Sequence, residues 1–132
     1  MHPDGLPVPA PPFRVGVSRS DGSVVVAVEG ELDLATAPQL RDHLVALPEE
    51  GRTRVILDLS HLQFIDSTGL SVLVMALNRS RADGGSVLIR HPSQAVLRIL
   101  EITGLVSVFA VETKEAVLPP EPRGTGGTGG TE

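Results

Sequence analysis

Cysteine, tryptophan and tyrosine are absent from the 132 residues, and three phenylalanines are the only aromatic side chains. Without cysteine, the chain has neither disulfides nor thiolate metal sites. The scarcity of aromatic rings removes the stacking platforms that single-stranded nucleic acid requires, and the net charge of −5 opposes binding to a phosphate backbone. These absences exclude a disulfide-stabilised domain and argue against direct nucleic-acid binding.

Long hydrophobic runs are also missing. The longest apolar stretch, residues 70–77, is far too short to cross a bilayer. The N-terminal residues contain no basic region followed by an apolar stretch, so they do not resemble a signal peptide. We therefore expect a soluble, cytoplasmic protein with no membrane partner.

The two ends differ in composition from the rest of the chain. Residues 1–12 hold five prolines, and residues 118–132 are mainly proline, glycine, threonine and charged side chains. Neither segment has enough apolar surface to bury, so we expect flexible tails. A single domain is predicted over residues 13–117.

The hydrophobic pattern of this domain predicts alternating strands and helices. The expected strands are residues 13–19, 24–31, 54–60, 86–90 and 106–111. The expected helices begin after Thr36 (ending near residues 48–51), at Ser67 (to Ala82) and after Ser93 (to Thr103), with a weak helical turn over residues 113–118. The order β-β-α-β-α-β-α-β predicts an α/β domain with a mixed sheet packed against helices.

The predicted helix over residues 67–82 is apolar on two sides. At about 100° per residue, one stripe that should face the core consists of Leu70, Leu73, Val74 and Leu77. The opposite stripe consists of Thr68, Val72, Met75 and Arg79. If exposed, the valine and methionine of that second stripe would form a contact surface for a partner. The pattern leaves open that they pack under another element.

The segment FIDSTGL, residues 64–70, lies between a predicted buried strand and this helix. Asp66, Ser67 and Thr68 therefore lie at a helix N-terminus, where free N–H groups and the helix dipole favour negative charge. A phosphate on Ser67 would be accommodated there. A serine at a helix start is usually a plain helix cap, and spacing alone does not exclude that interpretation.

Three motifs in order resemble the STAS-domain family, and specifically its anti-sigma factor antagonists. They are GELDLATAP at residues 30–38, DLS followed by FIDSTGL at residues 58–70, and HP with VLRIL and TGL between residues 91 and 105. The resemblance covers most of the chain, from about residue 13 to residue 111.

The resemblance implies a non-enzymatic, cofactor-free switch. Its implied partners are an anti-sigma factor serine kinase, which modifies Ser67, and a metal-dependent serine phosphatase, which restores the unmodified form. The unmodified form would bind the anti-sigma factor and release a sigma factor, as in stress-response or sporulation regulation. The implied partner surface comprises Asp33, Thr36, Asp66, Ser67, Thr68, Gly69, Val72 and Met75.

Some features depart from the family pattern. Ser71 occupies a position where many members have glycine, and the C-terminal helix of many members is reduced to residues 113–118 at best. The family also includes STAS scaffolds and subunits of lipid-transport complexes, which act by protein binding without phosphorylation. That alternative remains open, as do a second acceptor at Thr68 and the oligomeric state.

Three other function classes are weaker. A catalytic triad would need a histidine (His43, His61 or His91) to converge on Ser67, and no nucleophile-elbow motif surrounds that serine. A metal site at Asp58, His61 and Asp66 offers few zinc ligands. The glycines at residues 84 and 85 do not form a phosphate-binding loop.

Overall fold

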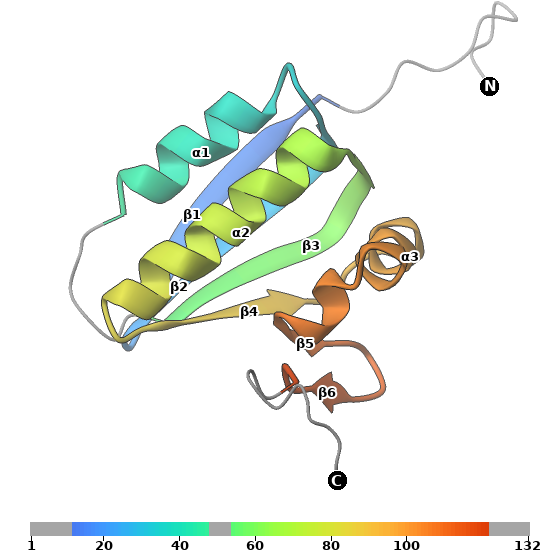
Figure 1. The fold of residues 1–132 in the computed structure, drawn as a ribbon. Helices are drawn as coiled ribbons and strands as arrows, with labels where there is room; N and C mark the ends of the chain where they lie inside the picture. The colour runs from blue at the N-terminus through green and yellow to red at the C-terminus, as the bar shows by residue number, and fades with distance from the viewer. Residues whose placement is uncertain (1–11, 48–53, 122–132) are drawn as a thin grey trace, which may run out of the picture.

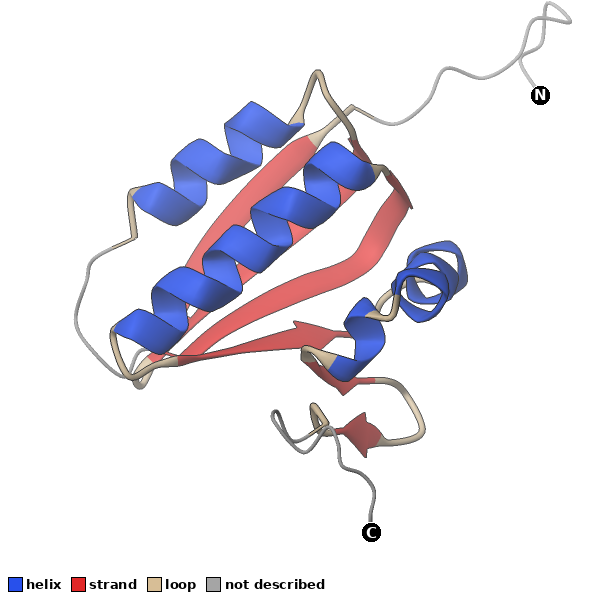
Figure 2. Ribbon diagram, viewed as in Figure 1, coloured by secondary structure: helices blue, strands red, loops and turns tan. Residues whose placement is uncertain are grey.

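The computed structural model describes residues 12–47 and 54–121. The strands are β1 (Arg14–Ser20), β2 (Ser23–Leu32), β3 (Arg54–Ile65), β4 (Ser86–Arg90), β5 (Ala110–Glu112) and β6 (Val117–Leu118). The helices are α1 (Ala37–Val45), α2 (Ser67–Ala82), α3 (Gln94–Thr103) and the short 3-10 helix η1 (Leu105–Ser107). Strands and helices alternate after the first hairpin, as Figure 2 shows. The predicted α/β class with a mixed sheet is confirmed.

The six described strands form one sheet in the order β1-β2-β3-β4-β5-β6. The pairs from β2 to β5 are parallel, and the two outer pairs are antiparallel. Each connection between two parallel strands contains one α-helix, and each leads to the next strand in the order β2-β3-β4-β5. Because such crossovers are right-handed, α1, α2 and α3 cover the same face, and Figure 1 shows α1 and α2 side by side over it.

The core lies between that face and the helices. Alternate residues of β2 are buried, which is the period of a strand with one covered face. One cluster joins them to buried residues of β3 to β5 and of all three helices, including Val26, Leu57, Leu73 and Leu100. Ile56 of β3 is buried but lies outside this cluster. Among the described residues, no helix is long and apolar enough to span a bilayer.

The bounds of α2, β4 and α3 match the sequence prediction. Strand β3 is longer than predicted and continues to Ile65, so His61 lies in a strand and not in a loop. The pairing of β2 with β3 contains two register shifts, near residues 27–29 and 30–31. Such irregularities let the pairing continue while the alternation of buried side chains breaks, which is why the pattern indicated an earlier end.

Two predictions near the C-terminal end were wrong. The expected strand over residues 106–111 is divided between η1 and β5. The expected helical turn over residues 113–118 is instead a hairpin, in which Thr113 N donates to Ala116 O at 2.7 Å and β6 pairs antiparallel with β5. The predicted helix end at residues 48–51 lies outside the described residues, and α1 ends at Val45. Most of both predicted tails also lies outside them.

Candidate functional site

The two longest strands of the sheet, β2 and β3, end side by side at one edge. Their last residues, Leu32 and Ile65, are register partners. The next residue, Asp66, donates its backbone N–H to Leu32 O at 3.1 Å. This bond ties the loop after β2 to the start of α2, so the two sequence motifs predicted to form the site lie at the same edge.

Helix α2 begins immediately after β3. Asp66 is its N-cap, with the carboxylate accepting from Gly69 N at 3.0 Å. The cap role therefore falls to Asp66, and not to the serine. Ser67 is exposed, and its hydroxyl forms no hydrogen bond with any described residue. Its backbone carbonyl accepts from Ser71 Oγ at 3.0 Å.

Gly69 brings the first turn of α2 close to the sheet. A Cβ at this position would lie 2.7 Å from Leu32 Cγ and 2.8 Å from Ile65 Cγ1. Both carbons belong to fully packed side chains, so they have little freedom to move. Gly69 is buried and has no side chain to offer a partner. Its contribution is to fix the position of Ser67.

The loop from β2 to α1 is held by side chains of its own. Thr36 Oγ1 donates to Glu31 O at 2.7 Å and accepts from Asp33 N at 2.9 Å. The carboxylate of Asp33 accepts from Ala35 N at 3.0 Å and from Thr36 N at 3.2 Å. Thr36 occupies the N-cap position of α1, as predicted, but its side chain makes no cap bond. The hydroxyl turns back toward the loop instead.

The expectation of a free apolar stripe on α2 was wrong. Val72 is only 7% exposed and belongs to the core. Met75 is half-buried, and Arg79 donates to Val45 O at 3.4 Å. Helix α1 therefore covers this stripe. Arg81 donates to Val108 O at 3.5 Å, which places the residue after η1 against the last turn of α2.

The exposed surface of α2 is mostly polar. Ser67, Ser71 and Asn78 are exposed, while Thr68 and Val74 are half-buried. Val74 was expected to face the core with its neighbours Leu70, Leu73 and Leu77, which are buried. The structure thus brings Asp33, Thr36, Asp66, Ser67 and Thr68 to one edge and places Gly69 and Val72 in the interior.

Two exposed apolar side chains at this edge were missed by the sequence analysis. Leu34, in the loop after β2, is 74% exposed, and Phe64, near the end of β3, is 44% exposed. Both lie inside the motifs that identified the site. Leu34 could have been noticed as a large apolar residue in a loop with polar neighbours. Phe64 could have been noticed once its pairing with the exposed Glu31 was known.

Among the described residues, no histidine forms a hydrogen bond with Ser67. His61 is the register partner of Glu29, well before the end of β3, and its Nδ1 lies 3.2 Å from Ser60 Oγ. That hydroxyl is bonded to Asp58 Oδ1 at 2.7 Å. His43 Nδ1 lies 2.9 Å from the carbonyl of Gln39. Within the described part of the chain, no three histidine or acidic side chains gather as a metal site would require.

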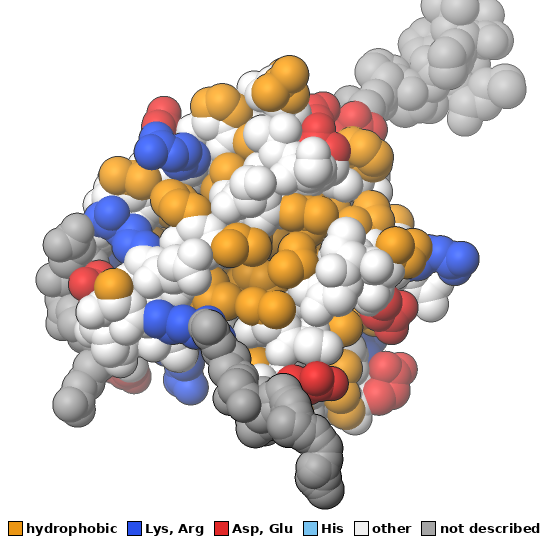
Figure 3. All heavy atoms as spheres, viewed as in Figure 1, with side chains coloured by type: hydrophobic (Ala, Val, Ile, Leu, Met, Phe, Trp, Pro, Cys, Tyr) orange, Lys and Arg blue, Asp and Glu red, His pale blue; other side chains and the backbone are white. Residues whose placement is uncertain are grey.

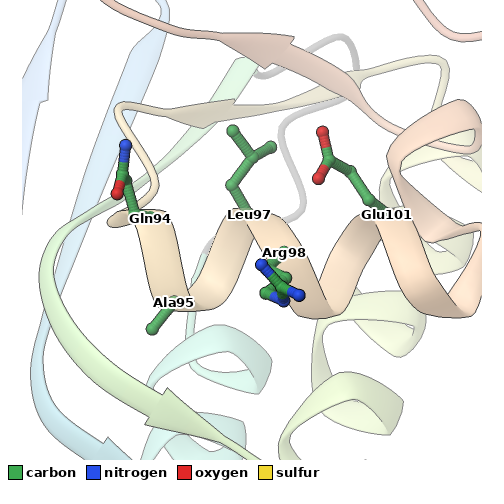
Figure 4. Close-up of a pocket in the computed structure, with 5 residues that line it drawn as sticks. All are labelled: Gln94, Ala95, Leu97, Arg98 and Glu101. Atoms are coloured by element: carbon green, nitrogen blue, oxygen red, sulfur yellow. The ribbon is translucent and has the colours of Figure 1, made fainter.

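A surface pocket of about 440 Å³ lies elsewhere, on α3. The residues that line it are Gln94, Ala95, Leu97, Arg98 and Glu101. Figure 4 shows Gln94, Leu97 and Glu101 on one side of the helix and Ala95 on the other. The lining includes neither Ser67 nor the loop after β2, so this pocket is separate from the candidate site.

Comparisons with known proteins agree with this geometry. A family model described as MlaB, STAS domain, matches residues 15–110. The anti-sigma-B factor antagonist of Bacillus subtilis (strain 168) is 34% identical over 102 residues, or 77% of this chain and 93% of that protein.

Solved structures are also similar to this chain. A crystal structure of an anti-sigma factor antagonist from Mycobacterium paratuberculosis has a TM-score of 0.66 at 31% identity, covering 76% of this chain and 86% of that one. Bacillus SpoIIAA in its phosphorylated form shares the fold, with a TM-score of 0.59 at 24% identity, covering 79% and 94% of the two chains.

The family model spans well over half of the chain, and the B. subtilis relative is matched along nearly its whole length. These relatives are antagonists of anti-sigma factors, which are regulatory binding proteins and not enzymes. The sequence motifs, the fold and the shared edge of β2 and β3 all agree with this relationship. The chain belongs to the STAS-domain family of anti-sigma factor antagonists.

Proposed function

We propose that the chain binds an anti-sigma factor serine kinase in the bacterial cytoplasm, and that phosphorylation of Ser67 ends this binding. The observation that carries the proposal is the free, exposed hydroxyl of Ser67 on the first turn of a capped helix. In the reaction, the Ser67 oxygen attacks the γ-phosphorus of the kinase's ATP. The bond to the β-phosphate oxygen breaks, ADP leaves, and a kinase base takes the hydroxyl proton.

The surroundings of Ser67 explain why a phosphate would oppose binding. Residues 31–36 and 64–71, which form the two junctions at this edge, contain three acidic residues and no lysine or arginine. A phosphate adds about 1.5–2 negative charges at pH 7, with no cation of these segments to neutralise it. A kinase that acts on Ser67 must bring its own ATP phosphates to the same point. The modified serine would then repel them and occupy their space.

The exposure of Ser67 also supports removal of the phosphate. A phosphate at Ser67 would stand on the outer surface of α2, where a metal-dependent serine phosphatase reaches it without unfolding the chain. The relative SpoIIAA has been solved in a phosphorylated form, so this fold tolerates the modification. We expect the phosphatase to restore the binding-competent form.

The test compares the wild-type chain with Ser67→Ala, Ser67→Asp, Thr68→Ala and Ser71→Ala. Incubation with the purified anti-sigma factor and ATP, followed by intact mass measurement and peptide mapping, should give one phosphate, on Ser67. Ser67→Ala should bind normally and stay unmodified. Ser67→Asp should bind more weakly, although one charge imitates a phosphate imperfectly.

The two neighbouring hydroxyls are the matched controls, because both lie within one turn of Ser67. A phosphate that persists in Ser67→Ala and disappears in Thr68→Ala would move the acceptor to Thr68. Binding without any phosphate, in the test tube and in protein purified from its own cells, would favour the alternative. The chain would then act as a STAS scaffold or lipid-transport subunit by protein binding alone.

A further inference from the structure

Leu34 and Phe64 are large apolar side chains held in the open at the edge that carries Ser67. They are 74% and 44% exposed. Single exposed apolar residues are common on protein surfaces. These two, however, belong to the two segments that the Asp66–Leu32 hydrogen bond joins. They therefore lie on two elements that end at the same edge as the acceptor. Ile65 packs under α2, so the preceding Phe64 faces the opposite side of the sheet.

Both side chains are carried by ordered backbone. Leu34 follows Asp33, whose carboxylate and backbone are bonded within the loop closed by Thr36. Phe64 lies in β3 and is paired with Glu31 of β2. An apolar residue on a fixed backbone loses little conformational entropy when a partner covers it. Such residues are efficient anchors of an interface.

Charge limits what can cover these side chains. The acidic residues of the two junctions are Glu31, Asp33 and Asp66, and residues 31–36 and 64–71 supply no basic side chain. Glu29, farther from the edge, is the register partner of Arg14. Figure 3 shows red side chains gathered near the start of α2, beside orange ones, and blue side chains toward its other end. The basic residues there include Arg79 and Arg81. A partner that covers the acidic edge must be basic at its rim.

We infer that Leu34 and Phe64 are the apolar anchors of the partner complex, received by an apolar pocket on the anti-sigma factor with lysine or arginine at its rim. This inference rests on the proposed function and adds to it the residues that hold the complex together.

The test measures the dissociation constant of the full-length chain for the purified anti-sigma factor that modifies it. Leu34→Ser and Phe64→Ser should each raise the constant by about tenfold, the effect of losing one interface anchor. Ile102→Ser is the matched control, because Ile102 is also 74% exposed but lies on α3. It should change the constant by less than about twofold.

Salt supplies a second measurement. The wild-type constant should rise between about 50 and 300 mM NaCl, because screening weakens an acidic-to-basic contact. Circular dichroism and thermal unfolding should confirm that each variant is folded.

Normal binding by both Leu34→Ser and Phe64→Ser, with Ser67 still phosphorylated, would overturn this inference and leave the proposed function standing. A wild-type chain that neither binds nor becomes phosphorylated would overturn both.

Discussion

Two strand-to-helix junctions meet at the carboxyl edge of the sheet, and they are built differently. The chain passes from β2 to α1 through four residues whose side chains and backbone bond to one another, centred on Asp33 and Thr36. It passes from β3 to α2 through Asp66 alone, where a cap bond and the close packing of Gly69 replace a loop.

The difference shows how one edge can serve two purposes. A loop closed by its own polar groups can carry an apolar side chain, Leu34, without burying it. A helix that starts directly from a strand, with its cap already supplied by Asp66, can present a free hydroxyl on its first turn. If this comparison is correct, a different kind of substitution should lower the free energy of unfolding at each junction.

The largest effect should come from filling the space at Gly69. Gly69→Val would place carbon atoms against Leu32 and Ile65, and overpacking of this kind costs about 3 kcal/mol. The free energy of unfolding, measured by urea denaturation, should fall accordingly. Gly16→Val is the control, because a Cβ at Gly16 meets nothing within 4 Å. Equal losses for the two variants would contradict the packing argument.

The loop junction should respond to a polar change of equal volume. Thr36→Val removes the hydroxyl that bonds to Glu31 O and Asp33 N, at about 0.5–1.5 kcal/mol per bond. We expect a loss of about 1–2 kcal/mol in thermal or urea unfolding. Thr103→Val is the matched control, since that hydroxyl donates to carbonyls of its own helix and accepts only a long bond, 3.5 Å, from Leu105 N. A larger loss in the control would refute the special role of Thr36.

The smallest effect should come from the cap of α2. Asp66→Ala should cost about 1 kcal/mol, because Gly69 N loses its side-chain acceptor. Asp66→Asn should restore most of this stability, since asparagine caps about as well as aspartate. Unfolding curves of the two variants would separate a cap from a charge effect. Equal destabilisation by both would mean that the carboxylate charge, and not the hydrogen bond, stabilises this junction.

Much of this edge could be predicted from sequence because its signals are local. A capping residue before an apolar run set the start of α2, and Gly104 set the end of α3 in a left-handed conformation. The exposed serine on the first turn of α2 followed from the FIDSTGL motif. These features depend on a few neighbouring residues, and the structure contains them at the predicted positions.

The failures depend on contacts between distant segments. The apolar stripe with Val72 and Met75 was expected to be open, but periodicity does not say that α1 lies against it. The length of β3 depended on register shifts in its pairing with β2. The β5–β6 hairpin depended on a partner strand only three residues long. In each case a contact with a distant segment decided the structure, and the local sequence pattern does not contain that contact.

The single-residue junction at Asp66 has a consequence for timing. Ser67 stands on a helix fixed to the sheet by a hydrogen bond at 3.1 Å and by Gly69 packing. Under the proposed function, no loop has to reorder before a phosphate on Ser67 weakens partner binding. The delay between signal and response would then be set by the two opposing enzymes and by partner dissociation. The phosphorylation state of Ser67 would then determine partner binding directly, with no slow conformational step in this protein.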